Sequence, residues 1–522
     1  MIKKKNNISR SEFLPCLLAV YVVAATAGML LVYHDYYYDI LETKCIYYCA
    51  CTILMLILTS AWLFLTAHPV EAVKGWKGKG VFDIISPVDA AAAVWGITIV
   101  LSTILSPVRI YAFWGNGGRY AGCFVLLLYI AAYFCITRYY QMKEWHMVIF
   151  LTAGILMCLF GITDFFDMDL LGFKAEIKES QRYKFTSTIG NINTYTSCVA
   201  MVMAYGGTMF VMAKDRKKAV GYGICTMISF VALILGESDN AYLSLAAFFG
   251  LLPLYALRTK KGTRRYLILT AAFFTAAEGI GLISRQMAGQ VIPISGLFQV
   301  IAGSRFLPVV ILVLWLGAGG CFWLEKGSAG EDSAMPAWLT RAWLVFMILA
   351  VLAGIFVLYD VNKAGNGVRY GGLQSYLLFN DGWGTNRGYV WRIAIEDYKK
   401  FSPLQQVFGY GPDTFGFITR MNNYPEMVER YQEIFDSTHN EYLQYLVTIG
   451  PLGLAAYCGT LITAAVHVAR RKKNNHLAVA AFLAVVCYSF QASVNITQPI
   501  ATPVMWTLLA VSVSGSKAGA IM

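Results

Sequence analysis

The sequence predicts an all-α fold, a polytopic transmembrane bundle of about 12 to 14 helices with one long extracytoplasmic loop that contains short helices. Three observations predict it. Of the 522 residues, 57% are hydrophobic and only 14% are charged, too few charges for the surface of a water-soluble globular protein of this size. Apolar runs of about 18 or more residues, long enough to cross a bilayer as a helix, recur along nearly the whole chain. Short basic clusters separate these runs.

The expected helices follow one another along the chain. They begin near residues 13, 46, 88, 121, 146, 191, 219, 239, 266, 306, 339, 438, 476 and 497. The first run, Phe13 to Tyr33, is too long for a signal peptide and lacks a small-residue cleavage site before His34, so we expect a retained anchor. This division puts about 11 helices in residues 1–359, the long loop in residues 360–437 and about three helices in residues 438–522.

The formal net charge of +12 indicates membrane topology and not nucleic-acid binding, because the basic residues lie in clusters between apolar runs. These clusters are Lys3–Lys5, Lys74–Lys79, Lys214–Lys218, Arg258–Arg265 and Arg470–Lys473. Acidic residues gather in the alternate loops. Since basic segments stay inside, we expect both termini to be cytoplasmic and the long loop to lie outside the cytoplasmic membrane. The bilayer is thus an expected partner, and nucleic acid is not.

The long loop from Asp360 to Ser437 is expected to carry function, as loops of this length usually do. Its one convincing helix runs from about Arg387 to Lys400. Arg387 and Trp391 are four residues apart and share a face of that helix, whereas Arg392 points elsewhere. A guanidinium beside the free N–H groups of a helix start suits an anion such as a diphosphate. The alternative is that Arg387 is simply a solvated surface residue. Asn386, the residue before it, is the expected helix cap.

His439 lies where the long loop meets the next apolar run. Thr438 and Glu441 fit a capping box, which would place His439 in the first turn of a membrane helix. Unpaired N–H groups there disfavour an imidazolium, so we expect a neutral ring that can act as a general base. A polar interfacial histidine is the alternative. The same helix should kink at Gly450-Pro451, because proline removes a backbone hydrogen bond.

Several of these motifs, taken in order, closely resemble the O-antigen ligase and O-antigen polymerase superfamily. The matching segments are Arg387-Gly-Tyr-Val-Trp391, Gly409-Tyr-Gly411 with Thr414-Phe415, His439-Asn-Glu-Tyr442 and Gly450-Pro-Leu-Gly453. Upstream, Gly115-Asn-Gly-Gly-Arg119 resembles the arginine-bearing outside loop of that family. Gly190-Asn-Ile-Asn193 resembles its Gly-Asn-Pro-Asn element, with isoleucine in place of proline.

The resemblance implies a membrane glycosyltransferase that moves a glycan from a polyprenyl diphosphate to a hydroxyl of a glycan, lipid or protein acceptor, outside the membrane. By motif match, His439 deprotonates the acceptor and Arg387 holds the diphosphate, with inversion at the anomeric carbon. The resemblance implies no metal and no cofactor. Asn193, Asn440 and Tyr442 fall within matching motifs and are candidate substrate-binding residues.

One departure from the family pattern leaves the second diphosphate clamp open. The family's Ser-Arg-Gly element is replaced here by Glu237-Ser-Asp239, so an aspartate stands where the arginine would be. Arg392, Arg119, Arg182 and Arg305 are all expected outside and are the candidates for that role. Asp239 either contacts sugar hydroxyls or is a polar turn residue.

Three alternatives stay open. A transporter or flippase of lipid-linked glycans would place its polar elements near the membrane midplane, whereas here they gather at one face. Asp167 and Asp169 match an Asp-x-Asp metal site, although their loop is rich in acids anyway. Glu278, inside an apolar run, is either functional or paired with Arg285.

Overall fold

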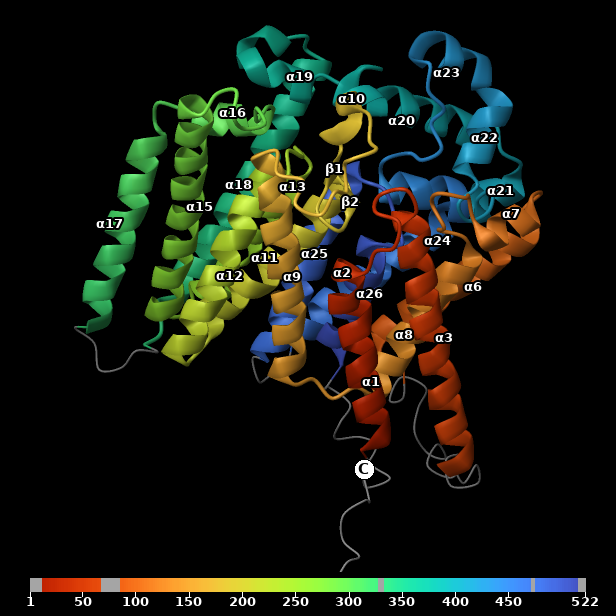
Figure 1. Ribbon diagram of the computed structural model, residues 1–522, viewed down its shortest axis with the longest axis horizontal. Coiled ribbons are helices and arrows are strands. Elements are labelled where there is room, and N and C mark those ends of the chain that lie inside the picture. Colours follow the sequence, from red (N-terminus) through yellow and green to blue (C-terminus); the bar gives the residue numbers. More distant parts are fainter. Residues whose placement is uncertain (1–11, 67–84, 327–332, 471–474, 515–522) are drawn as a thin grey trace, which may run out of the picture.

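The computed structural model describes residues 12–66, 85–326, 333–470 and 475–514, and nearly all of its regular structure is helical (Figure 1). Among these residues, eleven helical segments are long and apolar enough to cross a membrane, judged by length and composition. They are α1 (Phe13–Val23) continued by η1 (Ala24–Gly28) and α2 (Met29–Leu31), α3 (Ile40–Thr66), α6 (Pro87–Leu105), α9 (Glu144–Phe165), α11 (Ile192–Met212), α12 (Arg216–Leu235), α15 (Lys260–Gln286), α17 (Leu307–Lys326), α18 (Ala337–Asn362), α24 (Glu441–Ala469), and α25 (His476–Gln491) continued by η3 (Ala492–Val494).

Three further apolar helices are shorter: α8 (Cys123–Tyr139), α13 (Ala241–Leu251) continued by α14 (Pro253–Ala256), and α26 (Ala501–Val513). The expected all-α polytopic bundle is confirmed. The largest differences from the expected starts are at α3 and α15, which begin at Ile40 and Lys260. Thr259 caps α15 by accepting a hydrogen bond from the N–H of Gly262, so this helix begins inside its basic cluster. The Lys3–Lys5 and Lys74–Lys79 clusters, and the end of Arg470–Lys473, lie outside the described residues.

The centre of the bundle is built from α11, α25 and α26, whose side chains are buried on almost every side. Helix α11 packs against α12 and α25, and α26 packs against α25 and α8. Trp506 of α26 stacks on Trp95 of α6, with ring centroids 4.9 Å apart. In contrast, the apolar window of α18 is 0% buried. A helix that is apolar all round and uncovered by protein suits a lipid environment.

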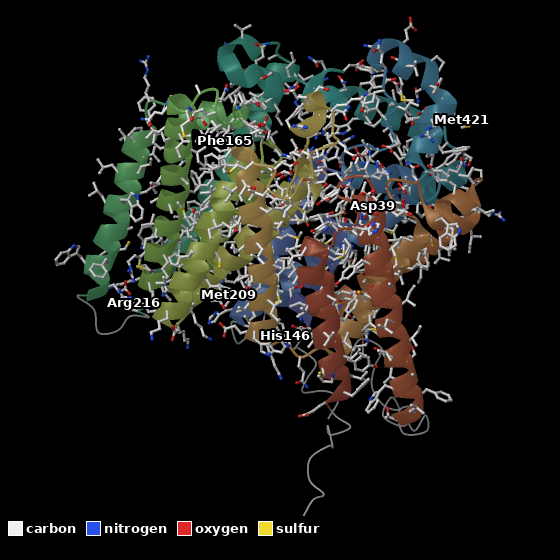
Figure 2. All side chains as sticks on the ribbon, in the orientation of Figure 1. Asp39, His146, Phe165, Met209, Arg216 and Met421 are labelled. Atoms are coloured by element: carbon white, nitrogen blue, oxygen red, sulfur yellow. The ribbon has the colours of Figure 1, made fainter. Side chains whose placement is uncertain are left out.

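The short elements gather at one end of the bundle, at the top of Figure 1. They are α10 (Glu179–Arg182), the antiparallel pair β1 (Phe185–Thr186) and β2 (Gly190–Asn191), α16 (Leu297–Ala302), η2 (Gly367–Leu373), α19 (Gln374–Leu377), α20 (Trp383–Lys399), α22 (Phe415–Asn422) and α23 (Tyr424–Tyr431). In the same region α7 (Arg109–Trp114) follows α6, and α21 (Pro403–Phe408) packs on α24. Figure 2 places Phe165 and Met421 at this end, and Arg216 and His146 at the opposite end.

Candidate active site

The chain enters α24 through an asparagine cap. Asn440 Oδ1 accepts hydrogen bonds from the N–H groups of Tyr442 at 3.0 Å and Leu443 at 3.1 Å. Thr438 Oγ1 instead donates to the carbonyl of Asn440 at 2.7 Å. The expected Thr438–Glu441 capping box is therefore wrong, because Asn440, an equally good cap, stands closer to the apolar run. His439 consequently lies before the helix and not in its first turn.

Glu441 turns into the bundle instead of closing a capping box. Its carboxylate is fully buried and accepts hydrogen bonds from the hydroxyls of Tyr457 at 2.6 Å and Tyr488 at 2.8 Å. Tyr457 belongs to α24 and Tyr488 to α25. A buried carboxylate requires such donors. The bond from Tyr488 fixes the start of α24 against α25, and the bond from Tyr457 ties it to a later turn of the same helix.

His439 adopts a strained backbone conformation. Its φ is +50°, in the left-handed region, and its N–H donates to Ser437 Oγ at 3.3 Å. Such a conformation costs on the order of 1–3 kcal/mol in a residue other than glycine and is common at functional sites. Burial lowers the pKa of His439 to about 3, and the positive charges of Arg387 and Arg119 add to the lowering, while Asp436 opposes it. The ring is neutral at pH 7, as expected, but burial is the main cause.

Arg387 comes from a sharp turn at the start of α20. Gly384, Thr385 and Asn386 all have positive φ, so regular helix begins only after them. The expected side-chain cap at Asn386 is wrong, because that residue is itself in the left-handed conformation, which is not a cap conformation. Arg387 NH1 donates to the carbonyl of Gly384 at 2.7 Å.

The guanidinium of Arg387 lacks a charged partner. Its Nε is buried without a hydrogen bond, and no carboxylate in the described part of the chain lies within ion-pair distance. Burial lowers the pKa of Arg387. A partly buried guanidinium without a counter-charge is unfavourable. An anion bound at Arg387 would supply the missing counter-charge.

Trp391 joins the Arg387 helix to the His439 segment. Its Nε1 donates to the carbonyl of Thr438, the residue before His439, at 2.9 Å. The long segment between α18 and α24, residues 363–440, is called the insert below; it has an apolar core of its own, which reaches α24 at Val447. The core is made by Tyr389, Val390, Ile393, Ala394, Phe401, Phe415, Ile418, Met427, Phe435 and Val447. The insert is thus packed onto α24, with Arg387 and His439 on adjoining segments.

The expected kink in α24 is confirmed. Gly450 has φ +79°, and Pro451 follows it. The carbonyls of Val447 and Thr448, which lose their helical partners there, accept hydrogen bonds from the N–H groups of Tyr410 at 3.0 Å and Gly411 at 2.9 Å. The Gly409-Tyr-Gly411 turn therefore caps the outer half of α24. A Cβ on Gly450 would collide with the carbonyl of Val407.

A second loop, residues 115–121, closes over this turn through two aspartates. Asp413 Oδ2 accepts hydrogen bonds from the N–H groups of Asn116 at 2.7 Å and Ala121 at 3.1 Å. Arg119 NH2 donates to Asp436 Oδ1 at 2.6 Å. Burial raises the pKa of Asp413 to about 7, opposed by those two hydrogen bonds and by Arg119. Arg119 is thus placed beside the site by a carboxylate three residues from His439.

Sequence reasoning did not select Asp413 or Asp436. Both stand within or beside motifs that it did select, the Gly409–Phe415 turn and the His439 segment. Their partners lie in the Gly115–Arg119 loop about 300 residues away in the chain, so no local pattern connects them. The resemblance of the Gly115–Arg119 loop to the family motif was the only sequence feature that pointed to this contact.

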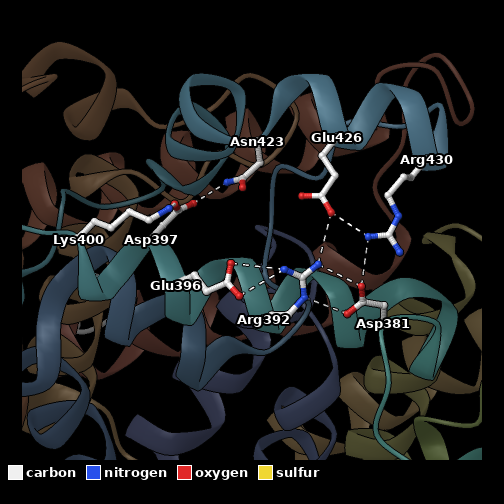
Figure 3. Close-up of polar contacts among 8 residues, drawn as sticks. All are labelled: Asp381, Arg392, Glu396, Asp397, Lys400, Asn423, Glu426 and Arg430. Atoms are coloured by element: carbon white, nitrogen blue, oxygen red, sulfur yellow. Dashed lines mark hydrogen bonds and ion pairs between the residues drawn. The ribbon is translucent and has the colours of Figure 1, made fainter.

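As expected, Arg392 points elsewhere than Arg387, and its guanidinium enters a network of ion pairs with carboxylates, which Figure 3 shows. It donates to Asp381 at 3.0 Å and 3.1 Å and contacts Glu396 and Glu426 at 3.3 Å and 3.5 Å. Arg430 joins the same group through Asp381 and Glu426. These carboxylates raise the pKa of Arg392 above its ordinary value. Three counter-charges make this arginine a poor second clamp.

Asn193 and Asp239 form a second polar cluster. Asn193 Oδ1 accepts hydrogen bonds from Ser238 at 2.7 Å and Asn240 at 3.1 Å. Asp239 accepts from the N–H of Leu297 at 2.8 Å and from the hydroxyl of Tyr376 at 3.0 Å. Both oxygens of Asp239 are therefore occupied in holding the α16 loop and the insert, which favours the turn-residue interpretation over sugar contact.

The remaining candidate residues are Arg182, Arg305, Tyr442 and Glu278. Arg182 is exposed and donates to the carbonyl of Ile177 at 3.2 Å, and Arg305 is exposed before α17. Neither has a described contact with His439 or Arg387. Tyr442 donates its hydroxyl to the carbonyl of Ser489 at 2.8 Å, which is a packing role. Glu278 pairs with Arg285 at 3.4 Å, the structural alternative for that residue.

Comparison with known families bears on this region. Residues 291–458 match the family model described as O-antigen ligase. This part of the chain is similar to O-antigen ligases. The match spans the insert, the Gly409 turn, His439 and the kink of α24, and it confirms the resemblance found in the sequence. No curated protein matches the chain. The O-antigen ligase match indicates a membrane glycosyltransferase of the ligase or polymerase type, acting on lipid-linked glycans.

Proposed function

We propose that this protein transfers a glycan from a polyprenyl diphosphate donor to an acceptor hydroxyl at the extracytoplasmic face of the cytoplasmic membrane, without a metal. One observation carries the proposal. A neutral histidine and an arginine whose buried Nε has no hydrogen-bond partner lie on adjoining segments, joined through the bond from Trp391 to Thr438. Group transfer from a diphosphate needs a proton acceptor for the nucleophile and positive charge for the leaving group.

The reaction follows from these two roles. His439 takes the proton of the acceptor hydroxyl while the hydroxyl oxygen attacks the anomeric carbon of the donor glycan. The bond from that carbon to the diphosphate breaks, and the diphosphate leaves with both bonding electrons. Arg387 and Arg119, whose positive charges both act on His439, balance the charge that develops on the leaving oxygen. Attack opposite the leaving group inverts the anomeric centre.

The charge distribution supports the extracytoplasmic side. The insert, α10 and α16 gather at one end of the bundle, whereas the basic start of α12 at Arg216 lies at the other (Figure 2). Basic ends of membrane helices stay in the cytoplasm. On this orientation the site opens outward, where His439 meets donors already carried across the membrane, and the termini are cytoplasmic.

The test is glycan transfer by purified protein in nanodiscs, with a polyprenyl-diphosphate oligosaccharide as donor. We expect His439→Ala to lower the rate by about 10²- to 10⁴-fold, since a positioned base contributes that much. The control is His34→Ala, which removes an exposed histidine paired with Asp39. Equal rates for His439→Ala and the wild type, at equal abundance and melting temperature, would remove His439 as the base.

A further inference from the structure

A basic groove opens at the end of the bundle opposite the insert, between α12, α15 and α17. Its volume is about 430 Å³. Five cationic side chains and one carboxylate line it: Lys214, Arg216, Lys261, Arg264, Arg265 and Glu325. Figure 2 shows Arg216 at this end, far from Met421 of the insert. The groove is therefore separate from the candidate active site.

Two of these cationic side chains, Arg264 and Arg265, already bind other groups of the protein. Arg264 Nε pairs with Glu325 at 2.7 Å. Arg265 is buried and donates to the carbonyls of Phe210 at 2.8 Å and Ala213 at 2.5 Å, where α11 ends. It thus satisfies carbonyls that have no helical partner. With Arg264 and Arg265 so engaged, the groove still holds more positive than negative charge.

Lys214 and Arg216 supply part of that excess. Both are exposed, and within the described residues neither side chain makes a hydrogen bond or ion pair. Asp215 between them is occupied as the cap of α12, where it accepts from the N–H of Lys218 at 2.9 Å. Arg216 is also the first residue of α12, a helix end that itself favours an anion.

Apolar side chains of α12 and α17 form one wall of the groove. Val220 of α12 is 54% exposed and Phe322 of α17 is 41% exposed, and both line it. The apolar window of α17 is only 11% buried, so this wall continues along the uncovered side of the bundle. A free phosphate has no apolar part that could pack against this wall. An amphiphile with a phosphate head and hydrocarbon tails matches both parts.

We propose that this groove binds an anionic membrane phospholipid, with its phosphate between Lys214 and Arg216 and its acyl chains along α12 and α17. Ammonium and guanidinium groups both recognise phosphate, and basic pockets between membrane helices are suited to anionic headgroups. The proposal stands independently of the glycosyltransferase function, because it uses none of its residues.

The test is lipid retention by the full-length protein in dodecyl maltoside, measured by native mass spectrometry with equal amounts of dioleoyl phosphatidylglycerol and dioleoyl phosphatidylcholine. We expect the wild type to retain phosphatidylglycerol preferentially. The variant Lys214→Gln/Arg216→Gln should bind it about thirtyfold more weakly, roughly fivefold for each charge removed. The charge-preserving variant Lys214→Arg/Arg216→Lys should bind it almost as the wild type does.

The matched control removes two exposed lysines at the other end of the bundle, as Lys178→Gln/Lys184→Gln, and should leave retention unchanged. Glycerol 1-phosphate should not displace the bound lipid, because it lacks acyl chains. Equal retention of the two lipids by the wild type would overturn the proposal, as would unaltered phosphatidylglycerol binding by Lys214→Gln/Arg216→Gln. Displacement by glycerol 1-phosphate would replace the lipid with a headgroup phosphate alone.

Discussion

At the scale of single residues, His439 and Arg387 share an energetic peculiarity. His439 has a left-handed backbone, and Arg387 has a buried nitrogen without a partner. Each feature destabilises the protein without a bound substrate by roughly 1–3 kcal/mol. Folds tolerate such features where a ligand compensates for them, and the region that matches the O-antigen ligase model includes both residues. The two residues are accordingly the most informative positions for substitution.

Replacing Arg387 with lysine tests the proposed diphosphate clamp. Lysine keeps the charge but loses the planar fork that binds two oxygens at once. We expect kcat/KM for the lipid-linked donor to fall about 10- to 100-fold, the value of one charge-assisted hydrogen bond or more. Arg285→Lys, at an arginine paired with Glu278, is the control. A fully active Arg387→Lys protein would rule out bidentate binding.

Asp413 provides a prediction about pH and stability. Its pKa rises from 3.8 to about 7 on folding, so between these values the folded state holds more protons than the unfolded state. The contribution of Asp413 to stability therefore falls as pH rises through that window. Asparagine cannot ionise but keeps an oxygen for the N–H groups of Asn116 and Ala121.

We therefore expect Asp413→Asn to melt at a higher temperature than the wild type near pH 8, with the difference disappearing near pH 4. Asp413→Ala, which loses both hydrogen bonds, should melt lower at either pH. Thermal denaturation in detergent measures all three proteins. Parallel melting curves for Asp413→Asn and the wild type across this range would contradict the raised pKa.

At the scale of elements, the kink of α24 is where the insert is attached to the bundle. The Gly409-Tyr-Gly411 turn caps the outer half of the helix, and Ser102 of α6 donates to the carbonyl of Thr448 at 2.8 Å. Gly450-Pro451 allowed the kink to be predicted, because proline removes a hydrogen bond wherever it stands. The segment that supplies replacement donors could not be predicted, since it lies about 40 residues earlier in the chain and is identified only by tertiary contact.

Gly450→Ala should weaken this attachment. Alanine disfavours the backbone conformation of Gly450 (φ +79°, ψ 173°) by about 1–3 kcal/mol, and its Cβ would meet the carbonyl of Val407. We expect a fall of several degrees in the melting temperature and a loss of transfer activity. Gly319→Ala in α17 is the matched control, because a Cβ there meets open space in a regular helix. Wild-type stability in Gly450→Ala would show that the kink does not depend on glycine.

At the scale of the whole molecule, the bundle was predictable and the site only partly so. Each membrane helix is encoded locally, by a run of apolar residues, and hydropathy therefore finds it. The candidate site draws on Arg119, Arg387 and His439, which come from three separate segments and are brought together by contacts such as the pair from Arg119 to Asp436. Motif resemblance found these residues, but the strained backbone and the missing counter-charge are visible only in the folded structure.

The orientation of the whole bundle leads to a topology prediction. An epitope tag inserted at Gly372, an exposed glycine of η2 with open space around it, should bind antibody on intact spheroplasts. A tag inserted at Lys217, at the basic end, should bind only after the membrane is permeabilised. The opposite labelling pattern would place the insert in the cytoplasm and exclude an extracytoplasmic reaction.

The arginines beside His439 have a consequence for the order of events. Without substrate, burial above all, and then the charges of Arg387 and Arg119, lower the pKa of His439 and leave it a weak base. A diphosphate that binds between them offsets their charge, so the proton affinity of the ring increases on donor binding. In the proposed mechanism, nucleophile activation is thereby coupled to donor occupancy. In that mechanism water that enters the vacant site meets a poor base, which limits futile turnover and favours loading of the donor before the acceptor.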